Sequence, residues 1–329
     1  MQRVISRRRF LQSTAGVMAG ALSASGLANT YPSRPIKLIV PHGPGSGSDV
    51  RARPIAERLG QVLGQPVVVE NRAGGAGVVG TLSVVQARPD GYTLLFGAVS
   101  ELGAAPAFRN DLPFDPLKDL QPISQTAQGS TVLLVHPAFK AKSVSELVAL
   151  CKARPGSVTC ASGGAGSLAH LSLLDFRSLT GTDILHVPYK AAGQAHSDVI
   201  AGHSDMIFDY FVSMAGFIRG GKLRPLMHSG KVRNAAFPNI PTSAEVGLPK
   251  FDLVAWNGLL APAGTPRLVV DRLHAAFVKV MRSEDMMRIV ADSGSEVVAG
   301  TPEQFGQFIK AYIQKSRELV RATGATLDG

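Results

Sequence analysis

Residues 36–49 read IKLIVPHGPGSGSD, and this stretch decides the fold. A short apolar run, typical of a buried strand, leads directly into a loop that contains three glycines. Behind the loop, apolar side chains recur every three or four residues from 52 to 63, which is the spacing of an amphipathic helix. A strand joined by a tight loop to a helix is the unit from which parallel α/β sheets are built.

The same alternation continues along the chain. Further strands are expected at 67–69 and 93–96, and a new one is expected to begin at 132 and run to 135. Capping boxes at Ser143 and at Thr301 predict the starts of two later helices, the second with proline at its first position. The pattern predicts an α/β protein, and its 329 residues indicate two domains.

A second loop of similar composition, CASGGAGS at 160–167, lies between an apolar run and a helix expected from Leu168. A helix N-terminus presents unpaired N–H groups and a partial positive charge, which suits a carboxylate or phosphate. Ligands of open α/β sheets bind at the carboxyl ends of strands, so the two loops predict one anion site between two lobes. Each loop alone is equally compatible with a plain strand-to-helix connection.

Motifs for catalysis are missing from the sequence. Neither loop has a nucleotide-binding or nucleophile-elbow pattern, and the histidines lack zinc-protease spacing. Asp198, Asp205 and Asp209 fall on different predicted elements, where capping or hydrogen bonding is the favoured role. We therefore predict no catalytic residue, no metal and no cofactor, and a binding protein rather than an enzyme.

The first 28 residues have the pattern of an export signal. Arg7 and Arg8 precede Phe10 and a mild apolar stretch that ends at Ala28, which indicates the twin-arginine route and a periplasmic mature protein. The alternative is a basic N-terminal arm. The segment carries four arginines and no acid, so the formal charge falls from +10 to +6 without it. The remaining basic residues are scattered, which argues against nucleic-acid binding.

Two cysteines, Cys151 and Cys160, are too few for a disulfide framework. A single bridge between them is compatible with an oxidising compartment, and the pairing stays open at this stage. An exported α/β enzyme also stays open as an alternative function, because the twin-arginine route often carries cofactor-bound enzymes.

Ordered motifs along nearly the whole mature chain resemble one family, the periplasmic solute-binding proteins of tripartite tricarboxylate transporters, or Bordetella uptake family. They are PIKLIVP at 35–41, ENR at 70–72, PDGYTLL at 89–95, AS and GS within 161–167, VPYK at 187–190, FD at 208–209, GKLR at 221–224, PT and GLP within 241–249, and APAGTP at 261–266.

The resemblance implies a two-lobed periplasmic binding protein of type II. Lobe 1 would comprise 31–129 and 252–300, lobe 2 would comprise 130–251, and a C-terminal helix in 301–329 would pack across both. The protein would act as a monomer, bind a small carboxylate between its lobes and deliver it to membrane transporter subunits. The alternative is that the ligand-bound protein signals to a membrane sensor. The implied ligand-binding residues are His42, Gly43, Gly45, Ser46, Gly47, Ser48, Asp49, Ser100, Ser162, Gly163, Gly166, Ser167, His170 and Asp209.

Several loop positions depart from the family's usual residues, so the identity of the ligand is not carried over. Ser46 replaces a second glycine, and His42 stands where an aromatic or apolar residue is common. Cys160 and Gly163 are also unusual in the second loop. Pro54, inside the first helix, is expected to remove a hydrogen bond and to push Arg53 away from helical geometry.

Overall fold

The computed structural model describes residues 31–325, so the expected export signal lies outside the described residues. The strands are β1 Ile36–Val40, β2 Val67–Asn71, β3 Thr93–Ala98, β4 Leu120–Val135, β5 Thr159–Ser162, β6 Leu185–Pro188, β7 Met206–Tyr210, β8 Arg224–His228, β9 Val254–Pro262 and β10 Ser295–Val297. The helices are α2 Gly47–Leu63, η1 Gly75–Gly77, α3 Val78–Val85, η2 Ser100–Ala104, α4 Ala105–Phe108, α5 Val144–Ala153, α6 Leu168–Thr180, α7 Ala192–Ala201, α8 Phe211–Arg219, α9 Arg267–Met281, α10 Glu284–Asp292 and α11 Pro302–Thr323.

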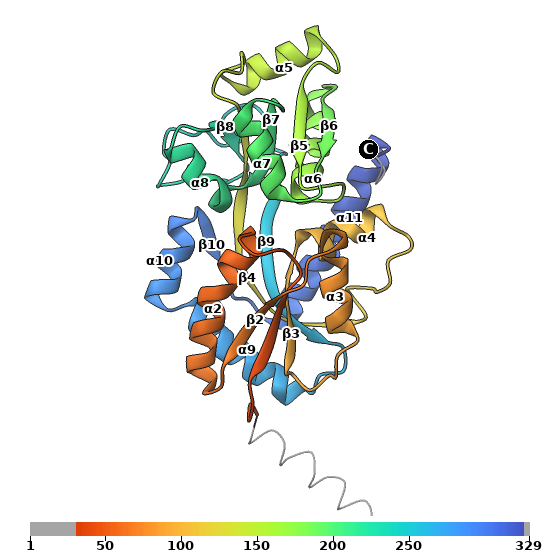
Figure 1. The fold of residues 1–329 in the computed structure, drawn as a ribbon, viewed down its shortest axis with the longest axis vertical. Coiled ribbons are helices and arrows are strands. Elements are labelled where there is room, and N and C mark those ends of the chain that lie inside the picture. Colours follow the sequence, from red (N-terminus) through yellow and green to blue (C-terminus); the bar gives the residue numbers. More distant parts are fainter. Residues whose placement is uncertain (1–30, 326–329) are drawn as a thin grey trace, which may run out of the picture.

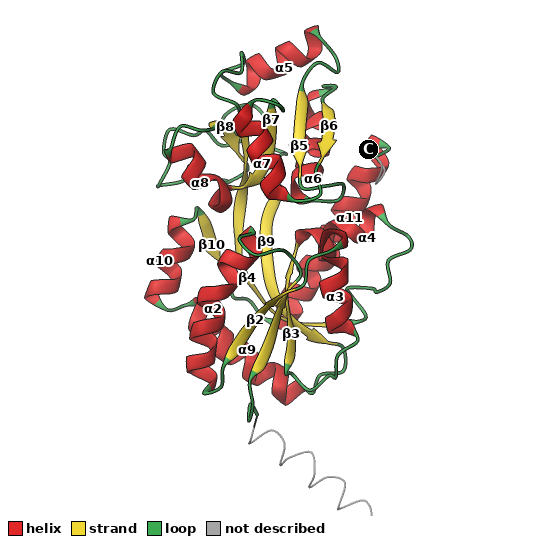
Figure 2. Ribbon diagram, in the orientation of Figure 1, coloured by secondary structure: helices red, strands yellow, loops and turns green. Residues whose placement is uncertain are grey.

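Two α/β lobes lie one above the other and share their longest strand (Figure 1). In the lower lobe β2, β1 and β3 are parallel, and in the upper lobe β7, β5 and β6 are parallel. The remaining pairings, which involve β4, β8, β9 and β10, are antiparallel. The sheets are therefore more mixed than the expected parallel ones, and helices cover their faces (Figure 2).

Strand β4 connects the lobes and corrects one sequence prediction. It begins at Leu120 rather than at 132, because β9 and β10 pair with its polar first part. That pairing ends at Ser130, and β7 and β8 take over from Thr131 to Val135. The predicted lobe boundaries stay predictions. The boundary predicted after residue 129 lies close to the point where β4 stops pairing with β9 and begins to pair with β7 and β8.

Helix α11 packs against elements of both lobes. Its Phe305, Ile309 and Ile313 share one buried cluster with Trp256 of β9 and with Leu171 of α6. Thr301 caps the helix with the complete capping box that the sequence predicts. Ser143 caps α5 as expected, but Glu146 accepts from the Lys142 amide instead of completing the box. No helix of the described chain has both the length and the apolar character needed to cross a bilayer.

Two further expectations are settled by the packing. Helix α2 runs without interruption through Pro54, so Arg53 keeps helical geometry and the predicted disruption is wrong. The loss of one backbone hydrogen bond at Pro54 is tolerated because Ala52, Ile55 and Leu59 anchor the helix in the core of the first lobe. Cys151 and Cys160 are free and buried, which answers the open question of a bridge between them.

Candidate functional site

The two glycine loops share the backbone turn that directly precedes the helix cap. Gly45 and Gly166, each one residue before a helix cap, have φ angles of 77° and 76°. Both values lie in the left-handed region that favours glycine. The loops follow β1 and β5, so each lies at the carboxyl end of a parallel strand, as the sequence predicts.

Both loops also use the same hydrogen bonds. Ser46 caps α2 by accepting from the Asp49 amide, and Ser167 caps α6 by accepting from the His170 amide. The side chain at that third helical position then accepts from the glycine amide: Gly45 donates to Asp49 Oδ2 at 2.9 Å, and Gly166 donates to His170 Nδ1 at 3.1 Å. These pairs of residues are separated by the same 121 positions, so the loops are structural equivalents.

Asp49 acts as the brace of the first loop. Its carboxylate accepts from Gly45, Arg53 and Asn71. Burial acts to raise the pKa of Asp49, but these hydrogen bonds outweigh it and hold the pKa below its ordinary value. Both carboxylate oxygens of this predicted ligand residue are thus engaged within lobe 1.

His170 braces the second loop as a neutral group. Its ring stacks on His186 of β6, with centroids 4.0 Å apart, and on Phe108 of the other lobe at 5.2 Å. Burial, with repulsion from His186 and Arg177, lowers the pKa of His170 to about 3. Ser162 Oγ lies 2.6 Å from His186 Nε2 and accepts from the Gly164 amide, so it too holds the loop.

The remaining predicted residues occupy different surroundings. Ser48 Oγ accepts from Asn257 Nδ2 at 3.0 Å, and Gly163 packs on Ala192 at the start of α7. Ser100 begins the π-helical turn η2 after β3, and Gly43 faces open space. Asp209, at the end of β7, contacts His196 Nε2 at 2.5 Å and accepts from the Tyr210 amide at 2.6 Å.

Glu101 is a buried carboxyl that sequence reasoning missed. It lies in η2, fully buried, where Oε1 accepts from the Ala98 amide and Oε2 has no partner. Burial raises the pKa of Glu101 to about 8 and lowers that of His42, whose Nε2 is 3.6 Å from Oε2, to about 4. The two groups are therefore neutral together near pH 7. The available signal was an acidic residue within an otherwise apolar and small-residue stretch, three positions after β3 ends.

The lobes meet at the N-terminus of α2. A side-chain carbon on Gly47 would lie 3.0 Å from Ser213 Oγ and 3.9 Å from the Tyr210 ring, both of the second lobe. The predicted residues of the first loop thus face the end of β7 and the start of α8. The second loop meets the first lobe through the stack of His170 on Phe108.

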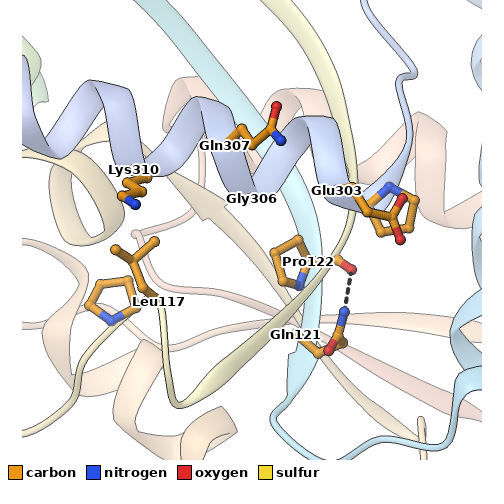
Figure 3. Close-up of a pocket in the computed structure, with 9 residues that line it drawn as sticks. Leu117, Gln121, Pro122, Glu303, Gly306, Gln307 and Lys310 are labelled. Carbon is orange, nitrogen blue, oxygen red and sulfur yellow. Dashed lines mark hydrogen bonds between the residues drawn. The ribbon is translucent and has the colours of Figure 1, made fainter.

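A hollow of about 450 Å³ lies elsewhere, between the segment 116–122 and α11 (Figure 3). Leu117, Gln121 and Pro122 line one side, and Gly306 and Lys310 line the other. None of its lining residues belongs to either loop. Residues 31–325 also contain no group of three or more His, Cys, Asp or Glu side chains placed to hold a metal ion.

Comparison with known proteins decides the family. Residues 51–325 match the tripartite tricarboxylate transporter family receptor. The chain belongs to this family. Protein BugT of Bordetella pertussis is 38% identical over 328 residues, which cover 99% of each chain. The resemblance drawn from the sequence motifs is thereby confirmed.

Two solved structures have the same fold. Rpa4515 of R. palustris, solved with adipate, is 28% identical with a TM-score of 0.85, over 89% of this chain and 98% of its own. MatC of Rhodopseudomonas palustris, with bound malate, is 30% identical with a TM-score of 0.82, over 88% of this chain and all of its own. The two-lobed α/β fold expected from the sequence is therefore confirmed, and the family is one of solute-binding receptors.

Proposed function

We propose that this protein is a periplasmic receptor that captures a small organic acid between its lobes and delivers it to a tripartite membrane transporter. The observation that carries the proposal is the matched pair of loops, each ending in a serine-capped helix N-terminus, where the partial positive charge of the helix suits an anion. The adipate and malate in the two related structures support a carboxylate as the solute.

The donors of the site are backbone amides, and the side chains of Asp49 and His170 hold them in place. This arrangement binds a carboxylate without a reactive side chain, as a receptor requires. Export by the twin-arginine route and action as a monomer belong to the same proposal. Closure of the lobes over the acid would then form the surface that the transporter recognises.

The first test is thermal unfolding of the mature protein with adipate, malate, citrate and an aromatic acid, followed by calorimetric titration. We expect at least one acid to raise the midpoint, because a solute that binds only the folded state stabilises it by mass action. Uptake of that labelled acid by cells with and without the receptor gene then tests delivery. If no acid class shifts the midpoint, the receptor proposal is wrong.

A variant at the contact between the lobes sharpens this test. Gly47→Val places carbon atoms against Ser213, so we expect it to hinder closure and to weaken acid binding about tenfold. Gly216→Val is the matched control, because Gly216 lies in α8 with nothing within 4 Å of an added side chain. Equal affinity in the two variants would contradict a site at the first loop.

A further inference from the structure

Arg51 lies in α2, one turn beyond Gly47 and therefore on the same face of the helix. Gly47 lies against Tyr210 and Ser213 of the second lobe, and the Arg51 guanidinium, one turn further along α2, points to β9 and β10. In Figure 1 the N-terminal end of α2 rises toward the upper lobe, with β10 beside it. The residue is only 9% exposed.

The guanidinium of Arg51 has neutral hydrogen-bond acceptors only. Nη1 donates to Asn257 Oδ1 at 3.5 Å, and Nη2 donates to Ser295 Oγ at 3.1 Å. Within residues 31–325, no carboxylate lies within 4.0 Å of it. Burial lowers the pKa of Arg51, yet an arginine in a protein stays protonated.

A buried charge without a counterion is unfavourable, and proteins normally pair such groups. The more exposed Arg53 and Arg58 of the same helix both have a carboxylate partner, Asp49 and Asp285. Arg51 is the exception and also reaches the first loop, since Asn257 bonds both to its guanidinium and to Ser48 Oγ. The charge that would complete this arrangement is an anion from outside the chain.

We propose that Arg51 supplies the countercharge for a carboxylate group of the acid held at the first loop. The inference rests on the proposed receptor function and adds a specificity residue to it. A guanidinium fork matches the two oxygens of a carboxylate and selects it over a neutral amide or hydroxyl. The first loop then contributes backbone amides, and Arg51 contributes the full charge.

The test measures two quantities, the affinity for adipate, malate and citrate and the thermal midpoint of the free protein. Arg51→Met removes the charge with little change of volume, and Arg51→Gln keeps a donor for Asn257 and Ser295. We expect both variants to bind the acid that binds the wild type best about tenfold to a hundredfold more weakly. The midpoint of free Arg51→Met should stay the same or rise, because an unpaired buried charge is gone.

A merely structural tie between α2 and the strands β9 and β10 gives the opposite result. The midpoint of Arg51→Met would then fall, while folded Arg51→Gln would keep wild-type affinity, and that pair of results overturns the proposal. Arg58→Met, two turns further along the same helix at the half-buried ion pair with Asp285, is the control and should leave affinity unchanged. If the wild type binds none of the acids, the receptor function itself fails, which is a distinct outcome.

Discussion

In the first loop the Gly45 amide donates to a carboxylate, whereas in the second loop the Gly166 amide donates to an imidazole. The φ angles of Gly45 and Gly166, the serine caps and the spacing match in the two loops. The environments are not, because Asp49 is surrounded by Arg53 and Asn71, while the His170 ring is stacked between two other rings.

This difference separates what the backbone does from what the side chains do. Either an aspartate or a histidine can accept from the glycine amide, so the turn itself does not require a particular charge. The charge is set by the surroundings: in the first lobe the buried cation Arg51 lies in the helix that follows the loop, and in the second lobe the neutral ring of His186 stacks on His170. The two loops therefore share a turn and differ in the charge of their surroundings.

The largest expected effect is acid sensitivity of the second loop. The pKa of His170 is lowered from 6.5 to about 3 and that of the stacked His186 to about 4, with Arg177 as the nearby charge. The unfolded chain therefore binds more protons below pH 6.5, and stability is lost as the pH falls from 6.5 toward 3. Each tenfold change in proton affinity is worth about 1.4 kcal/mol, so the loss should reach several kcal/mol.

Urea unfolding at pH 7 and pH 4.5 measures this loss. His170→Asn keeps an acceptor near the position of Nδ1 but does not titrate, so the variant should lose less stability between the two pH values. An equal loss in the variant and the wild type would show that the imidazole of His170 does not brace the loop as a neutral group.

The second prediction concerns Glu101 of the first lobe and the loss of stability as the pH rises. Burial raises the pKa of Glu101 from 4.5 to about 8, and His42 and Tyr210 face the carboxyl. The folded state keeps a proton that the unfolded chain releases, so the contribution of Glu101 to stability is lost as the pH rises from 4.5 through 8, with the opposite sign to the histidine contribution below pH 6.5. Glu101→Gln should remove most of the slope in urea unfolding between pH 7 and pH 8.5, a window above the ordinary histidine pKa of 6.5.

The smallest effect tests the likeness of the two turns. Gly45→Ala and Gly166→Ala should each lower the free energy of unfolding by about 1–2 kcal/mol, because both positions have positive φ. Gly43→Ala is the control, since Gly43 is not among the positive-φ glycines and has open space around it. If the decreases in the free energy of unfolding caused by Gly45→Ala and Gly166→Ala differ by more than about 2 kcal/mol, the two turns are not equivalent.

Much of this architecture could be predicted from local sequence patterns. The strands after which the loops lie, the serine caps and the C-terminal capping box depend on residues close together in the chain. The two loops were recognised as a pair because glycine, serine and strand-to-helix position recur in both. The family motifs added the fold, because they extend over nearly the whole mature chain.

Other features required distant parts of the chain to meet. The first part of β4 is polar and becomes a strand only because β9 and β10 pair with it. The interruption expected at Pro54 does not occur because core contacts hold α2 on both sides of it.

The protonation and pairing of the charged residues near the loops also depend on distant parts of the chain. By itself, the sequence determined where the two helix N-termini and their serine caps lie, because capping and turn geometry are local. Only the tertiary structure decided that Glu101 is buried, that His170 stacks on Phe108, and that Arg51 is buried against Asn257 and Ser295 with no ion pair among residues 31–325. The protonation and the pairing of a charged side chain depend on burial and on neighbours far away in the sequence, and these exist only after the lobes have formed.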